Sequence, residues 1–208
     1  SNEIRVIARN ADQPNSRWYS GAGIYRSVVL WTAPSGHITV NGLAARTISA
    51  DAAGRARIAV DVETNAVGDV EIMIPEAGVD MVGACVVGDN TFEIDVENAR
   101  LWSPEHPDLY RMTARFTADG AAESDTASIT FGIRTLEWSD SGLLINGSRV
   151  ILQGACVHHD NGVLGACAYA DAEERKIRLM KANGYNAIRS AHNPCSKAML
   201  DACDRLGV

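Results

Sequence analysis

The chain has 208 residues, of which 46% are hydrophobic and 22% are charged, a composition typical of a folded globular protein. Its formal charge is −7 and it has no cluster of Lys and Arg to neutralise phosphates, so we expect no nucleic-acid partner. No apolar run approaches the ~20 residues that cross a bilayer, and the first residues lack the basic-then-apolar pattern of a signal peptide. We therefore expect no membrane partner.

The first part of the chain, from Glu3 to about Phe131, has the pattern of β-structure. Short runs alternate apolar and polar residues, which predicts strands with one buried face. The clearest runs are residues 57–62, 70–74, 91–96 and 109–116. Turn signals separate them at Asn41-Gly42, Ala53-Gly54 and Asp119-Gly120. About seven strands in about 100 residues are typical of an immunoglobulin-like sandwich, which we place at residues 32–134.

The residues before this sandwich are predicted to belong to a different domain. The stretch Ala33-Pro34-Ser35-Gly36 has the composition of a domain junction. Residues 1–31 are therefore expected to be the last strands of a preceding domain.

A proline-rich block lies near the end of the sandwich, at residues 101–110 (LWSPEHPDLY). Its two prolines fix an extended turn, from which Trp102, Leu109 and Tyr110 can pack into the sandwich. Stacking of Trp102 on a sugar is the alternative role. We prefer the packing role, because an aromatic side chain beside such a turn more often anchors the edge of a domain.

Residues 135–208 predict two strand-then-helix units. The first strand, residues 150–157, is followed by His158, His159 and Asp160, and the second, residues 186–189, by the sequence SAHNP. In a parallel α/β barrel the carboxyl ends of the strands face the active site. These two polar clusters are therefore the expected position of substrate-binding residues.

Each unit also carries signals for its helix. Asp171 and Glu174 predict an N-cap and capping box for a helix at residues 172–183. Ser196 predicts the N-cap of the second helix, and Gly207 its end. The apolar residues of the second helix fall at helical spacing and predict one buried face. They are Met199, Leu200, Cys203 and Leu206.

Several blocks, in this order along the chain, resemble glycoside hydrolase family 2, the β-galactosidase and β-glucuronidase family. They are residues 18–26 (WYSGAGIYR), 101–110, 131–135 (FGIRT), 153–160 (QGACVHHD) and 186–194 (NAIRSAHNP). The resemblance implies the end of a jelly-roll sugar-binding domain, an immunoglobulin-like domain and the first two βα units of a (β/α)8 barrel. We therefore predict a mainly β chain that is an internal fragment of a family 2 enzyme.

The resemblance also implies a set of substrate-binding residues. His158 and His192 match family histidines that hydrogen-bond sugar hydroxyls, and Asp160 and Arg189 match the family's acidic residue and arginine. For Arg189 an ion pair inside the barrel is the alternative. His159 is expected beside the site or at the surface. Trp18 and Tyr19 lie in a Gly-rich turn that the resemblance places near the rim of the site, and contact of these two residues with substrate stays open.

The resemblance implies a retaining mechanism, which uses two carboxylates about 5 to 5.5 Å apart. In the family these are glutamates on later barrel strands. The glutamates after Val150 are Glu173 and Glu174, which fall in the first turn of a predicted helix, where negative charge suits the helix dipole. We therefore assign no catalytic residue in this chain and expect it to be inactive by itself.

The remaining expectations concern cofactors, compartment and substrate. His158, His159, Asp160 and His192 are metal ligands by type, which leaves a metal site as the alternative, but their spacing matches no metal motif. We therefore expect no cofactor and no metal. Five cysteines without CxxC spacing favour free thiols and the cytoplasm, with a periplasmic or secreted location as the alternative.

The expected partner is a carbohydrate, most simply a β-galactoside, with β-glucuronidase or β-mannosidase specificity as close alternatives. The longer parent is also a candidate homo-oligomer. A second hypothesis, from a different class, is a non-catalytic immunoglobulin-like module that binds carbohydrate or a protein partner.

Overall fold

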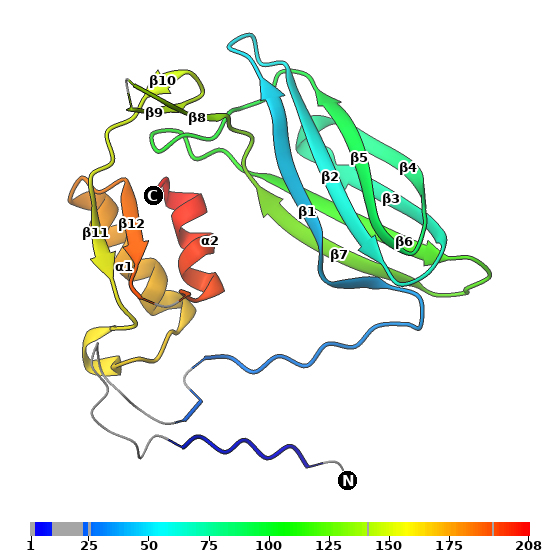
Figure 1. Cartoon of the computed structure of the whole chain (residues 1–208), viewed down its shortest axis with the longest axis horizontal. Coiled ribbons are helices and arrows are strands. Elements are labelled where there is room, and N and C mark those ends of the chain that lie inside the picture. The colour runs from blue at the N-terminus through cyan, green and yellow to red at the C-terminus, as the bar shows by residue number, and fades with distance from the viewer. Residues whose placement is uncertain (1–2, 10–22, 25, 141, 193) are drawn as a thin grey trace.

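The computed structural model describes residues 3–9, 23–24, 26–140, 142–192 and 194–208. A β-sandwich and a smaller α/β part lie side by side, and the described stretches that precede the sandwich run beneath them (Figure 1). Trp18, Tyr19 and Asn193 lie outside the described residues. The predicted fold class is confirmed: an immunoglobulin-like sandwich is followed by two βα units.

The sandwich is built from two antiparallel sheets between residues 38 and 131. One sheet has the order β1-β2-β5 and the other β4-β3-β6-β7. The strands are β1 (Ile38–Ala50), β2 (Ala56–Thr64), β3 (Gly68–Ile74), β4 (Val79–Cys85), β5 (Gly88–Val96), β6 (Tyr110–Ala118) and β7 (Ser124–Phe131), with the short 3-10 helix η1 (Pro75–Ala77) between β3 and β4. The four runs predicted from alternation fall in β2, β3, β5 and β6.

The alternation of the sequence produces the core directly. Ile58, Val60 and Val62 of β2 are buried, and they face Val70 and Ile72 of β3 across the sandwich. Apart from Ala59, which is also buried, β2 buries every second residue, as a period of two requires when one face of each sheet meets the other sheet. The sandwich core is therefore continuous from β2 to β6.

Two of the three predicted turns are turns, and the third is not. Gly54 lies between β1 and β2 and Gly120 between β6 and β7, both with positive φ. Asn41-Gly42 instead lies inside β1, where the register shifts between Ile38 and Leu43 and Asn41 has a φ of 62°. Some bulges and the tight hairpin turns both place a residue in the left-handed conformation that Asn and Gly favour, so the dipeptide alone does not distinguish them.

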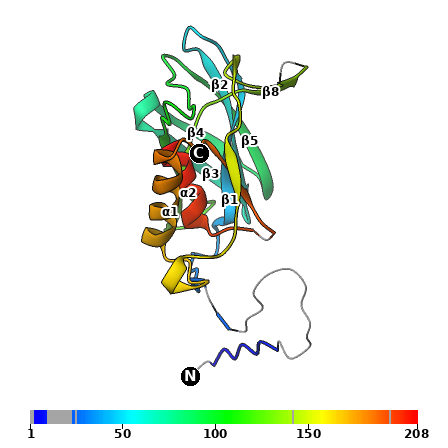
Figure 2. The ribbon, with the colours of Figure 1, turned by 90° about the vertical axis from the view of Figure 1, so that its left-hand side faces the viewer.

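The α/β part follows through a small antiparallel sheet. Its strands β8 (Leu136–Ser139), β9 (Gly142–Ile145) and β10 (Ser148–Arg149) lead into the two βα units. The units are β11 (Gly154–Val157), the 3-10 helix η2 (Gly162–Leu164), α1 (Ala170–Ala182), β12 (Ala187–Ser190) and α2 (Lys197–Leu206). β11 and β12 pair in parallel, and both helices pack on one face of them (Figures 1 and 2).

The helix signals are partly right. Ser196 caps α2 by accepting from the Met199 N–H at 3.2 Å, and Gly207 ends it in the left-handed conformation. α1 begins two residues earlier than predicted: its N-cap is Tyr169 without a side-chain bond, so the capping box at Asp171 and Glu174 is wrong. The predicted buried face of α2 is wrong at one position. Leu200 is 53% exposed, and Ala202 is buried with Met199 and Cys203 in its place.

Trp102 joins the sandwich to the α/β part. Its side chain is buried, its indole Nε1 donates to the Asp204 carbonyl at 2.7 Å, and the Arg134 guanidinium lies 4.5 Å from its ring centre. Lys181 of α1 adds bonds from Nζ to the carbonyls of Pro104 (2.6 Å) and Gly207 (2.7 Å). The proline-rich block therefore holds the helices of the α/β part, and stacking of a sugar on Trp102 is wrong because the ring is covered.

Replacing Trp102 by Phe should weaken this joint. Trp102→Phe removes the indole donor and leaves the Asp204 carbonyl without it, so we expect the free energy of unfolding to fall by about 1–3 kcal/mol. Urea denaturation followed by circular dichroism measures the loss. Trp138→Phe is the control, because Trp138 is 74% exposed. Equal losses in the two variants would contradict the role of Trp102.

Candidate functional site

The carboxyl ends of β11 and β12 bring the two candidate histidines together. The strands pair with Val157 opposite Ser190, so His158 and His192 follow on the same edge. Their ring centres are 5.7 Å apart, with the planes tilted by 44°. His158 is half-buried and His192 is exposed. The two imidazoles therefore offer adjacent donor and acceptor nitrogens at the end of the parallel pair.

The two faces of this strand pair have different roles. Val157 and Ile188 pack against the small core of Ile177 and Met199, so they face the helices. Because side chains alternate along a strand, Cys156 and Arg189 lie on the opposite face. Both are exposed, and an Arg189 guanidinium nitrogen lies 3.5 Å from the Cys156 sulfur. Arg189 thus lies along the sheet, on the face that the helices leave open.

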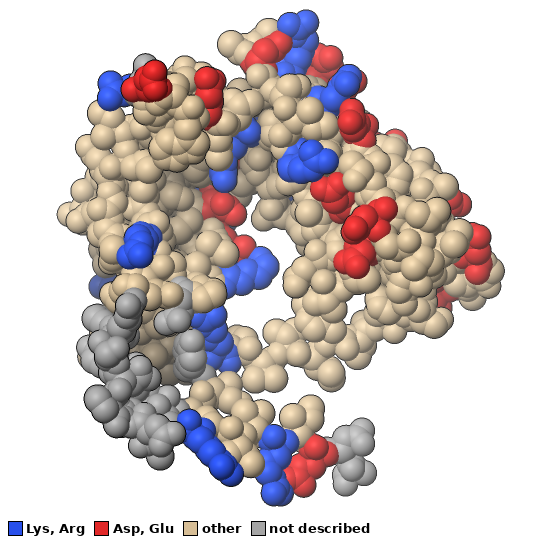
Figure 3. Space-filling model, in the orientation of Figure 1, with Lys and Arg blue, Asp and Glu red and all other residues tan. Residues whose placement is uncertain are grey.

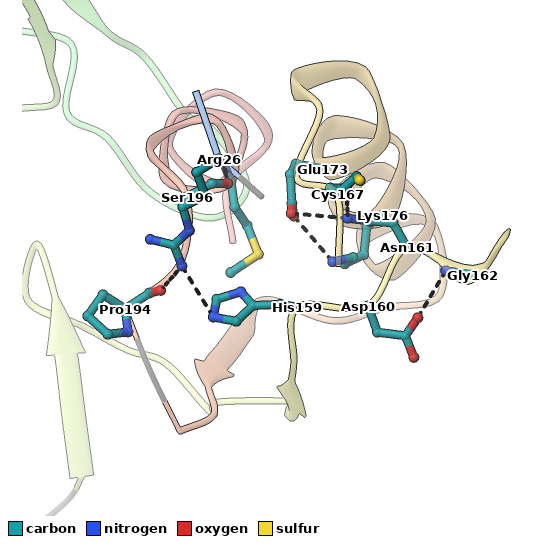
Figure 4. Close-up of polar contacts among 11 residues, drawn as sticks. Arg26, His159, Asp160, Asn161, Gly162, Cys167, Glu173, Lys176, Pro194 and Ser196 are labelled. Carbon is teal, nitrogen blue, oxygen red and sulfur yellow. Dashed lines mark hydrogen bonds and ion pairs between the residues drawn. The ribbon is translucent and has the colours of Figure 1, made fainter. Parts of the chain in front are cut away.

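Asp160 is directed into its own loop. Its carboxylate accepts the Gly162 N–H at 3.0 Å, at the start of η2. Figure 4 shows this carboxylate pointing away from the His159 ring. Asp160 and His158 also line a shallow recess of about 500 Å³ beside α1, together with Tyr185 and Lys176. Of the four predicted site residues, the structure therefore places His158 and His192 in contact and gives Asp160 and Arg189 other neighbours.

A larger cavity, of about 580 Å³, lies away from these strand ends. It opens between the linker before β1, the edges of β1 and β7, and Lys197 of α2. Figure 3 shows the hollow between the two parts on this face, with Asp and Glu side chains along the sandwich and Lys and Arg over both parts. None of the four predicted site residues lines this cavity.

Arg26 reaches the strand ends from far away in the sequence. Its guanidinium bonds to His159 Nε2 at 3.2 Å and donates from the same nitrogen to the Pro194 carbonyl (Figure 4). Arg26 therefore connects the loop after β11 with the loop after β12. The sequence pattern did not indicate this contact, because 133 residues separate Arg26 from His159 and neither lies in a periodic element.

The contact requires His159 to be neutral. A guanidinium has no acceptor, so His159 Nε2 must accept, which a protonated imidazole cannot do. Burial lowers the pKa of His159, and the nearby positive charge of Arg26 lowers it further. His159 is half-buried. The prediction that it lies beside the site or at the surface did not include its contact with Arg26.

Glu173 is buried and holds the loop before α1. Its carboxylate accepts from Asn161 Nδ2 at 3.3 Å and pairs with Lys176 at 3.2 Å, while Asn161 also donates to the Cys167 carbonyl (Figure 4). Glu174, the next residue, pairs on the surface with Arg178 and with Arg205 of α2. Both glutamates therefore make structural contacts of α1.

Within the described residues, no three His, Cys, Asp or Glu side chains are grouped so that they could hold a metal ion. No helix in the described ranges is at once long enough and apolar enough to traverse a bilayer. The five cysteines are free, and burial raises the pKa of the Cys203 thiol to about 12.

Comparison with known families places both parts of the chain. Residues 37–134 match the family described as "Glycosyl hydrolases family 2", and residues 136–208 match "Glycosyl hydrolases family 2, TIM barrel domain". A sandwich followed by the opening strands of a sugar-hydrolase barrel defines the class of protein. The chain belongs to glycosyl hydrolase family 2.

Individual relatives agree with this assignment. The β-galactosidase BoGH2A of Bacteroides ovatus is 31% identical over 99% of this chain and 26% of its own length. A protein named putative β-glucuronidase from Formosa agariphila is 29% identical over 100% of this chain and 21% of its length. A family 2 crystal structure from Bacteroides cellulosilyticus superposes with a TM-score of 0.80 at 34% identity, covering 94% of this chain and 29% of that one. The chain thus spans about a quarter of the length of these relatives.

Glu173 should matter far more to stability than its neighbour Glu174. Glu173→Ala leaves the largely buried Lys176 ammonium and the Asn161 amide without their acceptor, so we expect a loss of about 3 kcal/mol in the free energy of unfolding. Glu174→Ala is the matched control and should cost less than about 1 kcal/mol, because its ion pairs are partly exposed. Urea unfolding of both variants gives the comparison, and a small loss for Glu173→Ala would contradict the role assigned here.

His159 should make stability depend on pH. Its pKa in the folded chain is lower than the ordinary value of 6.5, so the unfolded chain binds the proton more readily. The stabilisation is present above that ordinary value and is lost as the pH falls through the lower, folded value. His159→Gln keeps an acceptor for Arg26 without titrating. Urea unfolding across this range should show a smaller loss on acidification for the variant, and identical pH profiles would contradict the expectation.

Proposed function

We propose that this chain is a section of a retaining β-glycosidase that hydrolyses terminal β-linked sugars, with β-galactosides as the substrate class. The observation that carries the proposal is the contact between His158 and His192 at the ends of two parallel strands, in a chain of this family. In a barrel this edge is the substrate-binding face. The name of the Bacteroides ovatus relative supports the choice of galactosides.

In this proposal the two histidines bind the sugar. A neutral imidazole has one donor and one acceptor nitrogen, and a sugar hydroxyl can both donate and accept. Two such rings 5.7 Å apart hold neighbouring hydroxyls and so fix the orientation of the ring. Arg189 lies on the open face of the strands, where a carboxylate or a sugar hydroxyl can reach it. Asp160 contributes after its carboxylate turns from the Gly162 N–H.

We further propose that the 208-residue chain does not catalyse hydrolysis by itself. A retaining mechanism needs a nucleophile and an acid/base, both carboxylates. Glu173 and Glu174 are held in contacts of α1, and among the described residues that follow β11 and β12 up to the helices, Asp160 is the one carboxylate. The open face of β11 and β12 also leaves Cys156 and Arg189 exposed, so water is not excluded there.

We also propose a substrate specificity and a cellular location for the parent protein. β-Glucuronidase is the close alternative to β-galactosidase, because the Formosa agariphila relative carries that name; β-mannosidase is the other. We place the parent in the cytoplasm on the compartment preference of free thiols, with the periplasm or secretion as the alternative. A homo-oligomeric parent is also proposed.

A stand-alone immunoglobulin-like module is the less favoured function. Such a module needs no βα units, yet Trp102 and Lys181 tie both helices to the sandwich. A buried contact of this kind between the sandwich and the helices favours two domains of one enzyme.

Assays of the chain and of its full-length parent test the proposal. The parent should hydrolyse p-nitrophenyl β-D-galactoside, and His192→Ala in the parent should lower kcat/KM by about 10- to 100-fold, because a lost sugar hydrogen bond costs about 1.4–2.7 kcal/mol. Ser148→Ala, at an exposed residue of β10, is the control. Faster hydrolysis of the glucuronide or mannoside would move the specificity to those sugars. Turnover of the galactoside by the 208-residue chain alone would contradict its predicted inactivity.

A further inference from the structure

The paired strands stop before the candidate histidines. β11 ends at Val157 and β12 at Ser190, and one further backbone bond, from the Ala191 N–H to the Val157 carbonyl, closes the pair at 2.9 Å. His158 and His192 both follow this last bond. The strand ladder therefore does not itself fix the distance between their loops.

Arg26 crosses between these loops beyond the last backbone bond. One guanidinium nitrogen contacts both His159, the residue after His158, and the Pro194 carbonyl, two residues after His192 (Figure 4). The Arg26 side chain is itself partly buried. A planar guanidinium presents several donors in a fixed geometry, which suits it to hold two acceptors at a set separation.

We propose that Arg26 is a positioning residue that sets the separation of His158 and His192 by holding the two loops together. The inference rests on the proposed function, because it assigns to Arg26 the geometry of the proposed sugar site. It also gives the segment before the sandwich a role in that site. Arg26 acts through His159 and Pro194 and does not touch the sugar.

The charges around His159 are consistent with such a link. Burial and the positive charges of Arg26 and Lys176 lower the pKa of His159 and favour its neutral form, while Glu173 favours the protonated form. The neutral ring is the one that can accept from Arg26. The contact between Arg26 and His159 is therefore made by the neutral imidazole, which is the form that burial and the neighbouring positive charges favour.

Nuclear magnetic resonance of the whole 208-residue chain tests the inference without any assay of activity. Histidine-labelled wild type should show cross-relaxation between the rings of His158 and His192, whose centres are 5.7 Å apart. Arg26→Met should weaken this signal several-fold and raise the pKa of His159 toward its ordinary value. Arg5→Met is the matched control, because Arg5 pairs with the exposed Glu3 in the same N-terminal segment.

The outcomes separate a positioning role from mere proximity. If Arg26→Met raises the pKa of His159 but leaves the ring-to-ring signal at its wild-type strength, the inference is wrong. If Arg26→Met does not fold, Arg26→Lys decides. The freely rotating lysine ammonium does not keep two N–H bonds in the fixed planar geometry of the guanidinium nitrogen, so the signal should fall while the amide signals of the sandwich stay unchanged. A wild-type signal in Arg26→Lys would then overturn the inference.

Kinetics of the parent enzyme link the geometry to the sugar. Arg26→Met should lower kcat/KM for p-nitrophenyl β-D-galactoside by about 10- to 100-fold, since small displacements of positioning groups have effects of that size. In the double variant with His192→Ala the two losses should be less than additive, because both act on one site. Additive losses would contradict the inference. A parent that hydrolyses no glycoside would contradict the proposed function, while the resonance experiment would still decide the role of Arg26.

Discussion

The parallel pairing of β11 with β12 is the constraint on which the rest of the site depends. It sets Val157 opposite Ser190, and so brings the loops that carry His158 and His192 to the same edge of the strand pair. The same pairing assigns the faces: Val157 and Ile188 go to the helices, and Cys156 and Arg189 to the open side. Had the strands paired antiparallel, the two histidines would lie at opposite ends of the sheet.

The α/β part keeps its place through contacts on its helix side. Its own core is small, and it gains support from the sandwich through Trp102 and from the two carbonyls that Lys181 holds. The strand side has no such cover within the described residues, where Cys156 and Arg189 are exposed. The joint lies on the helix side of the strands and the proposed sugar site at their carboxyl ends, so the contacts with the sandwich do not involve His158 or His192.

The local signals succeeded where one residue or one short period decides the outcome. Ser196 caps α2, and alternation located the core strands, because both depend on neighbours a few residues away. The local signals gave wrong predictions where the same short sequence is compatible with two different structures. Asn41-Gly42 forms a bulge inside β1. Asp171 lies within α1, because the Tyr169 carbonyl already accepts from the N–H groups of Ala172 and Glu173 and so begins the helix earlier. Ala202 rather than Leu200 is buried, since packing against the strands selects the helix face.

The sequence by itself determined the order of the elements, the two polar clusters and the family. Periodicity, capping and short motifs are local properties, so they can be read from residues near one another. The tertiary structure alone decided that Trp102 joins the two parts, that Glu173 is buried with Lys176, and that Arg26 meets His159. These contacts link residues from separate elements or depend on which face is covered, and no local pattern encodes which distant atoms meet.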